Sequence, residues 1–193
     1  MIYLILGGAR SGKSQYATQI ATQLSESDGL QVSYIAPATA IDDEMKARIQ
    51  RHQRERPDTW HLIEEPLAVS TAIRRTNDTQ IVLVDCLTLW LNNQIYHCPN
   101  QDFECLFADL IAAASASKSH IIFVSNEVGL GVIPMGEVTR QFVDQAGWMN
   151  QAIAKAADEV KFIAAGLPMS LKSRTNKVPM SAANAEQTSK RRE

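Results

Sequence analysis

Short, continuous runs of apolar residues recur along the chain, and the segments between them have apolar residues at every third or fourth position. Unbroken apolar runs are typical of strands that are buried on both faces of a parallel sheet. They predict strands at residues 2–6, 32–36, 81–85, 120–125 and 159–166. Helical spacing predicts helices at residues 14–24, 42–56, 66–75, 87–94, 103–115 and 136–157.

The alternation of strands and helices indicates βαβ units joined by right-handed crossovers. We therefore expect an α/β domain in which a mostly parallel sheet carries helices on both faces. The apolar periodicity stops at Ser173, and the residues beyond it are polar and include a basic cluster near the end. We expect one folded domain over residues 1–172 and a disordered polar tail over residues 173–193.

Composition and charge narrow the class of protein further. Of the 193 residues, 45% are hydrophobic and 21% are charged, which is the balance of an ordinary globular protein, and the net charge of -2 does not favour nucleic acid as a partner. The three cysteines, without CxxC spacing, argue against a disulfide framework and against a zinc site. We expect a cytoplasmic protein, because no apolar run is long enough to span a bilayer and the first residues lack a signal-peptide pattern.

A glycine-rich motif, GGARSGKS, lies between the first predicted strand and a predicted helix, which is the context of a P-loop. Glycines let backbone N–H groups curl around phosphates, the helix N-terminus adds a partial positive charge, the lysine reaches the outer phosphates, and the last hydroxyl binds Mg²⁺. The motif comprises Gly7, Gly8, Ala9, Arg10, Ser11, Gly12, Lys13 and Ser14.

An aspartate ends the apolar run IVLVD at Asp85, as in the Walker B motif, whose carboxylate assists the Mg²⁺ that Ser14 binds. A helix cap is the alternative role for Asp85. These two motifs predict a P-loop NTPase fold that binds a nucleoside triphosphate, but they fit a kinase, a motor ATPase, a switch GTPase or a nucleotidyl transferase alike. The chain has no NKxD motif, which disfavours a GTPase switch.

One histidine, His52, lies in the predicted helix over residues 42–56. The spacing of Met45, Ile49 and His52 places all three on one helix face, which is the apolar one. A half-buried, hydrogen-bonded histidine is one interpretation. The other is a nucleophile, because a neutral imidazole can attack phosphorus and the neighbouring arginines can neutralise phosphate oxygens. The residues by themselves leave both interpretations open.

Four ordered blocks resemble the bifunctional adenosylcobinamide kinase / adenosylcobinamide-phosphate guanylyltransferase family. They are GGARSGKS at residues 7–14, DDEMKARIQRHQRERPDTW at residues 42–60, SNEVGLGVIP at residues 125–134, and NQAIAKAADEV with GLPMSLK within residues 150–172. The resemblance implies a RecA-like P-loop domain that is commonly assembled as a trimer. It implies phosphorylation of adenosylcobinamide by ATP or GTP, and then transfer of GMP from GTP to adenosylcobinamide phosphate, which gives adenosyl-GDP-cobinamide in cobalamin biosynthesis.

The resemblance also assigns expected roles to single residues. His52 matches the histidine that carries GMP, and Lys13 serves catalysis at the P-loop. Further matches to nucleotide-binding positions are Tyr34, Ile35, Ala36, Gln53, Arg54, Glu55, Arg56 and Glu64. An ordinary surface carboxylate is an equal alternative for Glu64, and turn geometry is an equal alternative for Asn126 and Glu127, which are expected near the site.

Two other functions compete with this expectation. A plain small-molecule kinase would need no covalent step, so replacing His52 would leave its activity intact. A RecA-like ATPase that acts on a protein or nucleic acid would show hydrolysis stimulated by that partner. The short chain, its net charge and the lack of a long basic stripe argue against the second of these.

Overall fold

The computed structural model describes residues 1–39, 43, 44, 46, 56–76 and 80–174. Its strands are β1 (Ile2–Gly7), β2 (Val32–Ala36), β3 (His61–Glu64), β4 (Ile81–Asp85), β5 (His120–Asn126), β6 (Glu159–Ala164) and β7 (Leu167–Lys172). Its helices are α1 (Lys13–Asp28), α3 (Val69–Arg75), α4 (Leu87–His97), α5 (Phe103–Ala116) and α6 (Glu137–Ala156).

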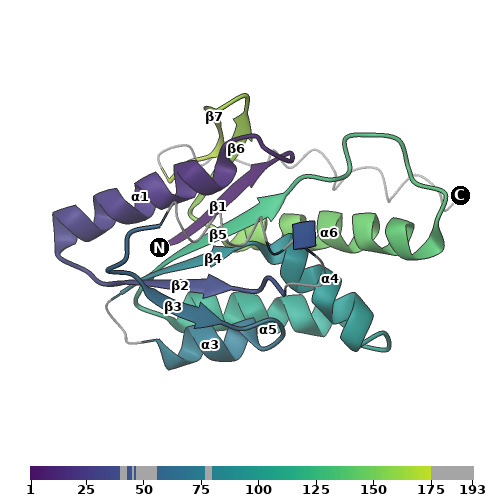
Figure 1. Cartoon of the computed structure of the whole chain (residues 1–193), viewed down its shortest axis with the longest axis horizontal. Coiled ribbons are helices and arrows are strands. Elements are labelled where there is room, and N and C mark those ends of the chain that lie inside the picture. Colours follow the sequence, from purple (N-terminus) through teal and green to yellow (C-terminus); the bar gives the residue numbers. More distant parts are fainter. Residues whose placement is uncertain (40–42, 45, 47–55, 77–79, 175–193) are drawn as a thin grey trace, which may run out of the picture.

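The strands form one seven-stranded sheet in the order β3-β2-β4-β5-β1-β6-β7 (Figure 1). All neighbouring strands are parallel except β6 and β7, which form an antiparallel hairpin. Only β5 separates β1 from β4, so the strand that precedes the P-loop and the strand that ends at Asp85 direct their carboxyl ends to the same edge of the sheet. This topology confirms the expected RecA-like, mostly parallel sheet.

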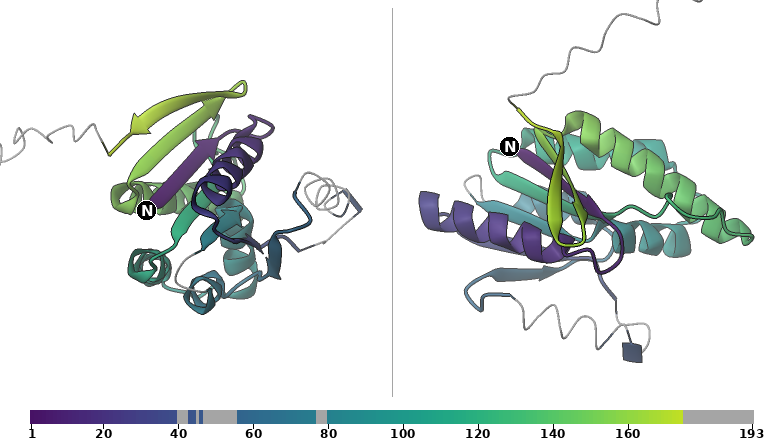
Figure 2. Two further views of the ribbon diagram at one scale, coloured as in Figure 1. Left: turned by 90° about the vertical axis from the view of Figure 1, so that its left-hand side faces the viewer. Right: turned by 90° about the horizontal axis from the view of Figure 1, so that it is seen from above.

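Helices cover both faces of this sheet, as expected (Figure 2). On one face, Tyr3 and Ile5 of β1 share an apolar cluster with Ala17 of α1. On the other face, Leu4 of β1 shares a larger cluster with residues of α3, α4, α5 and α6, among them the fully buried Trp90. Successive residues of β1 therefore point to opposite faces and both faces are covered, which explains the unbroken apolar run.

The two strands at the edges of the sheet did not appear in the sequence pattern. Three of the four residues of β3 are exposed, and so are most residues of β7, so neither strand has the continuous apolar run of the buried strands. The predicted strand over residues 159–166 was wrong at its end, because β6 stops at Ala164. Ala165 and Gly166 have positive φ angles of 51° and 79° and turn the chain into β7.

The predicted helix over residues 66–75 begins later, at Val69. The Glu65 carboxylate accepts the backbone N–H groups of Leu67 at 3.1 Å and Ala68 at 2.8 Å, which satisfies these donors in a turn before the helix. The other predicted helices within the described residues match α1, α4, α5 and α6 to within a few residues at each end.

Two predictions fall on residues that the structure leaves undescribed. Of the helix expected over residues 42–56, Asp43, Glu44 and Lys46 are helical and the rest up to residue 55 lies outside the described residues. Of the tail expected over residues 173–193, only Ser173 and Arg174 are described.

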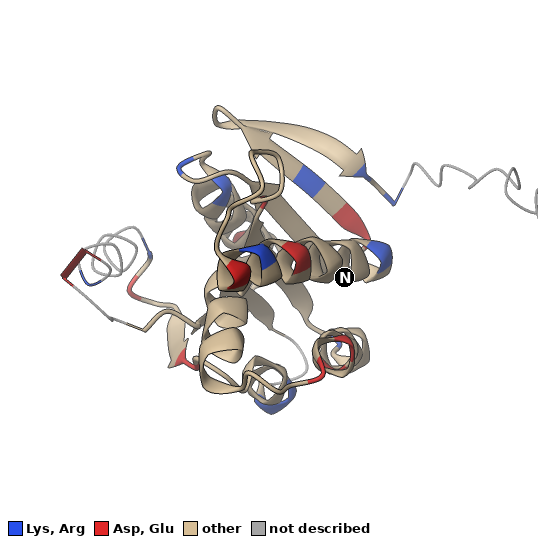
Figure 3. Cartoon of the chain, turned by 90° about the vertical axis from the view of Figure 1, so that its right-hand side faces the viewer, with Lys and Arg blue, Asp and Glu red and all other residues tan. Residues whose placement is uncertain are grey.

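Within the described part of the chain, no helix has the length and the apolar character needed to cross a membrane. Basic and acidic positions are interspersed along the ribbon in Figure 3.

Candidate nucleotide-binding site

The predicted motifs meet at the carboxyl-terminal edge of the sheet. Gly7, the last residue of β1, lies level with Asn126, the last residue of β5. Asp85, the last residue of β4, lies level with Val124, two residues earlier in β5. The P-loop and the strand-end aspartate therefore flank the end of one intervening strand. Crevices outside the carboxyl ends of parallel strands are where α/β proteins bind their ligands.

The first glycine of the P-loop is required by its surroundings. A Cβ atom on Gly7 would lie 2.6 Å from the carbonyl oxygen of Ile163 and closer still to Oγ of Ser11. Further along the loop, Arg10 and Gly12 have φ angles of 57° and 94°, which turn the backbone back toward α1. The loop thus curls tightly between β1 and α1, as a phosphate cradle must.

Lys13 is held close to this loop. Its side chain is buried, with 9% exposed, and Nζ donates a hydrogen bond to the carbonyl oxygen of Gly8 at 3.2 Å. Because Lys13 is also the first residue of α1, its ammonium group and the positive end of the helix lie together. Two sources of positive charge are thereby directed at the space above the loop, where they favour an anion such as a phosphate.

The hairpin of β6 and β7 supports the P-loop from the side. The backbone N–H of Gly166 donates to the carbonyl oxygen of Ser11 at 2.9 Å, and the Cα of Gly166 lies 3.3 Å from where a Cβ of Gly12 would be. The backbone N–H of Glu127, after β5, donates to the carbonyl oxygen of Gly7 at 3.1 Å. The sequence pattern missed these supports, because backbone contacts between distant segments leave no signal in it.

The groups expected to bind a metal ion fit that role only together with a nucleotide. Ser14 is the second residue of α1, directly after Lys13, and Asp85 ends β4 on the same side of the sheet as Leu83, which packs toward α1. Among the described residues, no cluster of three or more His, Cys, Asp or Glu side chains could hold a metal ion unaided. One carboxylate, one hydroxyl and substrate phosphates are the usual ligands of Mg²⁺ in nucleotide sites.

Tyr34 brings an aromatic side chain against this carboxylate. It is buried in β2, level with Leu83, so its side chain lies on the same face of the sheet as Asp85, two residues further along β4. Burial and the charge of Asp85 raise the pKa of Tyr34 well above its ordinary value, so the hydroxyl stays protonated beside the carboxylate. The next residue, Ile35, packs in the core on the opposite face, so only its backbone can face a nucleotide. Ala36 packs on the same face as Tyr34.

Arg56 lies over the tyrosine ring. Its guanidinium carbon is 4.2 Å from the ring centroid of Tyr34, and its Nε atom is buried without a hydrogen-bond partner. The ring of Trp60 is 6.5 Å from that of Tyr34 between centroids, at a tilt of 31°. Arg56 follows the segment 47–55, which lies outside the described residues and contains four expected site residues, namely His52, Gln53, Arg54 and Glu55.

Three other residues, Glu64, Asn126 and Glu127, were expected at or near the site, with a surface position or turn geometry as the alternative. Glu64 is exposed at the end of β3, level with Ala36 and therefore at the same edge of the sheet as the P-loop. The carboxylate of Glu127 accepts the backbone N–H of Gly129 at 2.9 Å, which gives it a role in turn geometry. Asn126 differs, because its Oδ1 atom is buried and has no hydrogen-bond partner.

Cys86 follows the strand-end aspartate and is the only buried cysteine of the three. Its Sγ atom lies 3.0 Å from Oγ1 of Thr88, and burial, with a smaller contribution from the charge of Asp85, raises the pKa of the thiol above its ordinary value. A protonated thiol is a poor nucleophile. Cys86 is therefore a packing residue at this edge of the sheet rather than a carrier of a transferred group.

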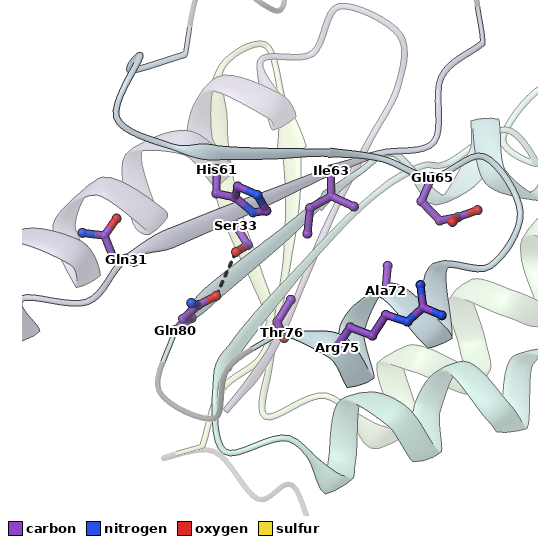
Figure 4. Close-up of a pocket in the computed structure, with 9 residues that line it drawn as sticks. All are labelled: Gln31, Ser33, His61, Ile63, Glu65, Ala72, Arg75, Thr76 and Gln80. Atoms are coloured by element: carbon purple, nitrogen blue, oxygen red, sulfur yellow. Dashed lines mark hydrogen bonds between the residues drawn. The ribbon is translucent and has the colours of Figure 1, made fainter.

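A separate cavity of about 470 Å³ lies between the β2–β3 edge of the sheet and α3 (Figure 4). Its polar groups include a hydrogen bond of 2.8 Å that Ser33 donates to Gln80. Several of its residues come from the amino-terminal ends of strands, away from the P-loop. The lining residues are Gln31, Ser33, His61, Ile63, Glu65, Ala72, Arg75, Thr76 and Gln80.

The chain is similar in sequence to known proteins over most of its length. Residues 3–171 match the family described as "Cobinamide kinase / cobinamide phosphate guanyltransferase". The bifunctional adenosylcobalamin biosynthesis protein CobP of Pseudomonas aeruginosa is 48% identical over 170 residues, which cover 88% of this chain and 96% of that protein. The bifunctional adenosylcobalamin biosynthesis protein CobU of Escherichia coli is 34% identical over 186 residues, which cover 89% of this chain and all of that protein.

Among solved structures, the flagellar accessory protein FlaH from Methanocaldococcus jannaschii is similar in fold. The TM-score is 0.54 and the sequence identity is 14%, over 89% of this chain and 78% of that one. At this identity the similarity concerns the fold alone.

Proposed function

The chain belongs to the cobinamide kinase / cobinamide phosphate guanyltransferase family, and we propose that it catalyses both reactions on adenosylcobinamide. It phosphorylates adenosylcobinamide with ATP or GTP and then transfers GMP from GTP to the phosphate, which gives adenosyl-GDP-cobinamide in cobalamin biosynthesis. The observation that carries this proposal is the buried Lys13 at a tightly curled P-loop, within a family match that covers residues 3–171.

The kinase step needs positioning and charge more than acid–base chemistry. We propose that backbone N–H groups of the P-loop and Nζ of Lys13 bind the β- and γ-phosphates. The substrate hydroxyl attacks the γ-phosphorus and loses its proton to solvent, the bond to the β-phosphate oxygen breaks, and the nucleoside diphosphate leaves. Ser14 and Asp85 would hold Mg²⁺, which supplies positive charge to the transferring group when it is bound with the nucleotide.

The transferase step needs a nucleophile, and we propose His52. A ring nitrogen attacks the α-phosphorus of GTP, the nitrogen–phosphorus bond forms, and pyrophosphate leaves. A phosphate oxygen of adenosylcobinamide phosphate then attacks the same phosphorus and releases the histidine. Covalent catalysis divides one difficult displacement into two easier ones. We propose that Arg56, with its unpartnered buried Nε, and its neighbours Gln53, Arg54 and Glu55 bind the nucleotide during this step.

The edge of the sheet provides further nucleotide contacts in this proposal. We propose that Tyr34, in β2, Ala36, at its end, and Glu64, level with Ala36, contact the base or ribose of the nucleotide. The backbone of Ile35 can contribute between them. We also propose that residues 1–172 form the catalytic domain with residues 173–193 as a polar tail, and that the enzyme works in the cytoplasm, where ATP and GTP are its substrates.

A homotrimer is the assembly that we propose. Residues 127–136, the apolar loop between β5 and α6, expose large apolar side chains that contact little within the chain. The exposed fractions are 78% for Leu130, 97% for Val132, 73% for Ile133 and 96% for Met135. Apolar side chains concentrated in this way are typical of a surface that another protein covers.

The experiment that tests the function uses GTP labelled at the α-phosphate. We expect label on the protein that is labile in acid and stable in base, as a phosphoramidate is. The His52→Ala variant should lose this label and GMP transfer but keep phosphorylation of adenosylcobinamide. His97→Ala, which removes an exposed histidine on α4, is the matched control and should behave as the wild type.

The two competing functions give different results in the same experiment. A plain kinase would show no protein-bound label and no effect of His52→Ala. A RecA-like ATPase would show neither product and would hydrolyse ATP faster on addition of DNA, RNA or a partner protein. Absence of label from the wild type would therefore contradict the guanylyltransferase proposal.

A further inference from the structure

Two contacts of one side chain connect parts of the site that are far apart in sequence. Tyr34 lies on β2 with 5% of its surface exposed, and its side chain points to the same face as Leu83 and Asp85 of the neighbouring strand β4. Its hydroxyl is near enough to the Asp85 carboxylate for that charge to act on it, which agrees with the register of the two strands. The strand register thus places the tyrosine beside the carboxylate expected to serve the metal ion.

A cation lies over the ring of the same tyrosine. The guanidinium carbon of Arg56 is 4.2 Å from the ring centroid, and Trp60 lies beside the ring with 6.5 Å between centroids. A guanidinium group stacked on an aromatic ring keeps its in-plane N–H donors available. Nε of Arg56 is such a donor, and it is buried with no hydrogen-bond partner, which points to a ligand that is still to be bound.

We propose that Tyr34 is a positioning residue for both reactions: its hydroxyl donates a hydrogen bond that orients the Asp85 carboxylate for the metal–nucleotide complex, and its ring orients Arg56 toward the phosphates of GTP. This inference rests on the proposed function and deepens it. In this proposal the Tyr34 side chain connects the P-loop region with Arg56, which directly follows the segment that contains His52.

The chemistry of each contact supports this role. A carboxylate that accepts one fixed hydrogen bond keeps a defined orientation, and its other lone pairs remain available to Mg²⁺ or to its water ligands. Mg²⁺ requires nearly octahedral geometry, so a rotated carboxylate binds it poorly. Arg56 gains from the ring a fixed plane, and a fixed plane is what bidentate recognition of phosphate oxygens needs.

The first test measures the contribution of the Tyr34 hydroxyl apart from that of its ring. We would measure the dissociation constant of GTP by calorimetry, once with Mg²⁺ and once with EDTA, for the wild type and for Tyr34→Phe. The ratio of the two constants reports the contribution of the metal ion. We expect Tyr34→Phe to reduce this ratio about fivefold to tenfold, because the hydrogen bond that orients the charged carboxylate is lost.

A double-mutant cycle identifies Asp85 as the group through which the hydroxyl acts. Asp85→Asn should reduce the same ratio, and adding Tyr34→Phe to it should cause little further change. Tyr3→Phe, which removes the hydroxyl of another buried tyrosine on the same face of the sheet, is the matched control. Unchanged Mg²⁺ dependence in Tyr34→Phe, or full additivity with Asp85→Asn, would overturn the proposal for the hydroxyl.

The second test concerns the ring. Arg56→Gln should lower the yield of GMP-labelled protein about tenfold and leave the metal ratio unchanged. Tyr34→Leu should lower both quantities, and adding Arg56→Gln to Tyr34→Leu should not lower the label further. Full labelling in Tyr34→Leu, with thermal unfolding as in Tyr34→Phe, would overturn the proposal for the ring.

The two hypotheses can fail separately. Metal-dependent GTP binding does not require group transfer. If the wild type binds GTP with Mg²⁺ but forms no protein-bound label, the guanylyltransferase function is contradicted. The role of the Tyr34 hydroxyl is then still decided by the binding measurements. A labelled wild type together with unchanged binding and labelling in the Tyr34 variants contradicts the positioning role alone.

Discussion

The backbone N–H of Gly166 donates a hydrogen bond of 2.9 Å to the carbonyl oxygen of Ser11, across more than 150 residues of sequence. The donor lies in the turn between β6 and β7, and the acceptor lies in the P-loop. Since backbone groups make this contact, it fixes the loop without using a side chain that could bind phosphate. The hairpin at one edge of the sheet is thus part of the nucleotide site, although it contributes no catalytic group.

Replacement of Gly7 tests how tightly this loop is packed. In Gly7→Ala the new methyl group would lie 2.6 Å from the carbonyl oxygen of Ile163 in β6, so the loop or the strand must move. We expect a loss of about 1–3 kcal/mol in the free energy of unfolding and loss of detectable GTP binding. Urea unfolding and calorimetry with GTP measure the two effects.

Gly147→Ala is the control for that replacement. Gly147 lies within α6, and nothing lies within 4 Å of where its Cβ would be. Since alanine is the better helix former, this variant should gain up to about 1 kcal/mol and bind GTP as the wild type does. Wild-type GTP binding by Gly7→Ala would show that the loop tolerates a side chain there.

Asn93 offers a test of the segment that contains His52. Its buried amide donates to the carbonyl oxygens of Pro37 at 2.8 Å and Pro66 at 3.1 Å, so one side chain of α4 joins the chain just after β2 to the chain just after β3. Asn93→Ala leaves both carbonyls without this donor. We expect a loss of about 1–3 kcal/mol in stability and a greater loss of GMP transfer than of phosphorylation.

The neighbouring Asn92 is the matched control, because it lies on the same helix and is exposed. Asn92→Ala should change the free energy of unfolding by less than about 0.5 kcal/mol and leave both reactions intact. Urea unfolding and the two activity assays distinguish the variants. Equal losses of both activities in Asn93→Ala would indicate general destabilisation rather than a loosened segment.

The inner part of the fold was predictable because each buried strand has its own apolar run. Residues 81–85, for example, are apolar up to Asp85 and form β4 as expected. The edge strands β3 and β7 were not predictable in this way, because their residues are mostly exposed and their backbone pairing with β2 and β6 determines their conformation. Strand pairing depends on neighbours that are distant in sequence, and local periodicity carries no information on them.

The candidate site, like the fold, could be predicted from the sequence only in part. The P-loop was predictable, since its glycines, Lys13 and Ser14 have fixed spacing between a strand and a helix. The position of Tyr34 beside Asp85 and next to Arg56 was not, because it depends on strand order and register. The role of His52 stays a prediction, since it lies outside the described residues.

His120 makes the stability depend on pH. Partial burial and the nearby N-terminal ammonium group lower the pKa of His120 in the folded protein. The charge of Asp28 raises it, but by less. In the unfolded chain the pKa is about 6.5, so the unfolded state takes up a proton first as the pH falls. Stability is therefore full at higher pH and decreases as the pH falls below that value.

The measurement is urea unfolding at several pH values from about 7.5 down to about 5.5, which includes the ordinary histidine range. His120→Gln cannot take up this proton, so its stability should fall less steeply than that of the wild type over the same range. An identical slope in both proteins would contradict a lowered pKa for His120.

The apolar loop, residues 127–136, provides the test of assembly. Val132 and Met135 are 97% and 96% exposed, so they contact almost nothing within the chain, and replacing them should not change folding of the subunit. In a trimer that buries these side chains, however, a charge at either position would be desolvated without a partner, which is costly. We expect the double variant Val132→Asp/Met135→Glu to be monomeric by light scattering where the wild type is trimeric.

The control for this variant places a charge elsewhere on the surface. Gln19→Glu adds one to an exposed position of α1 and should keep the wild-type mass. Thermal unfolding at low protein concentration, where subunits are separate, should be the same for all three proteins, because the loop side chains add nothing to the core of the monomer. A wild-type mass for the double variant would exclude this loop from the subunit interface, and the exposed apolar side chains of β7, namely Leu167, Met169 and Leu171, would then be the surface to replace next.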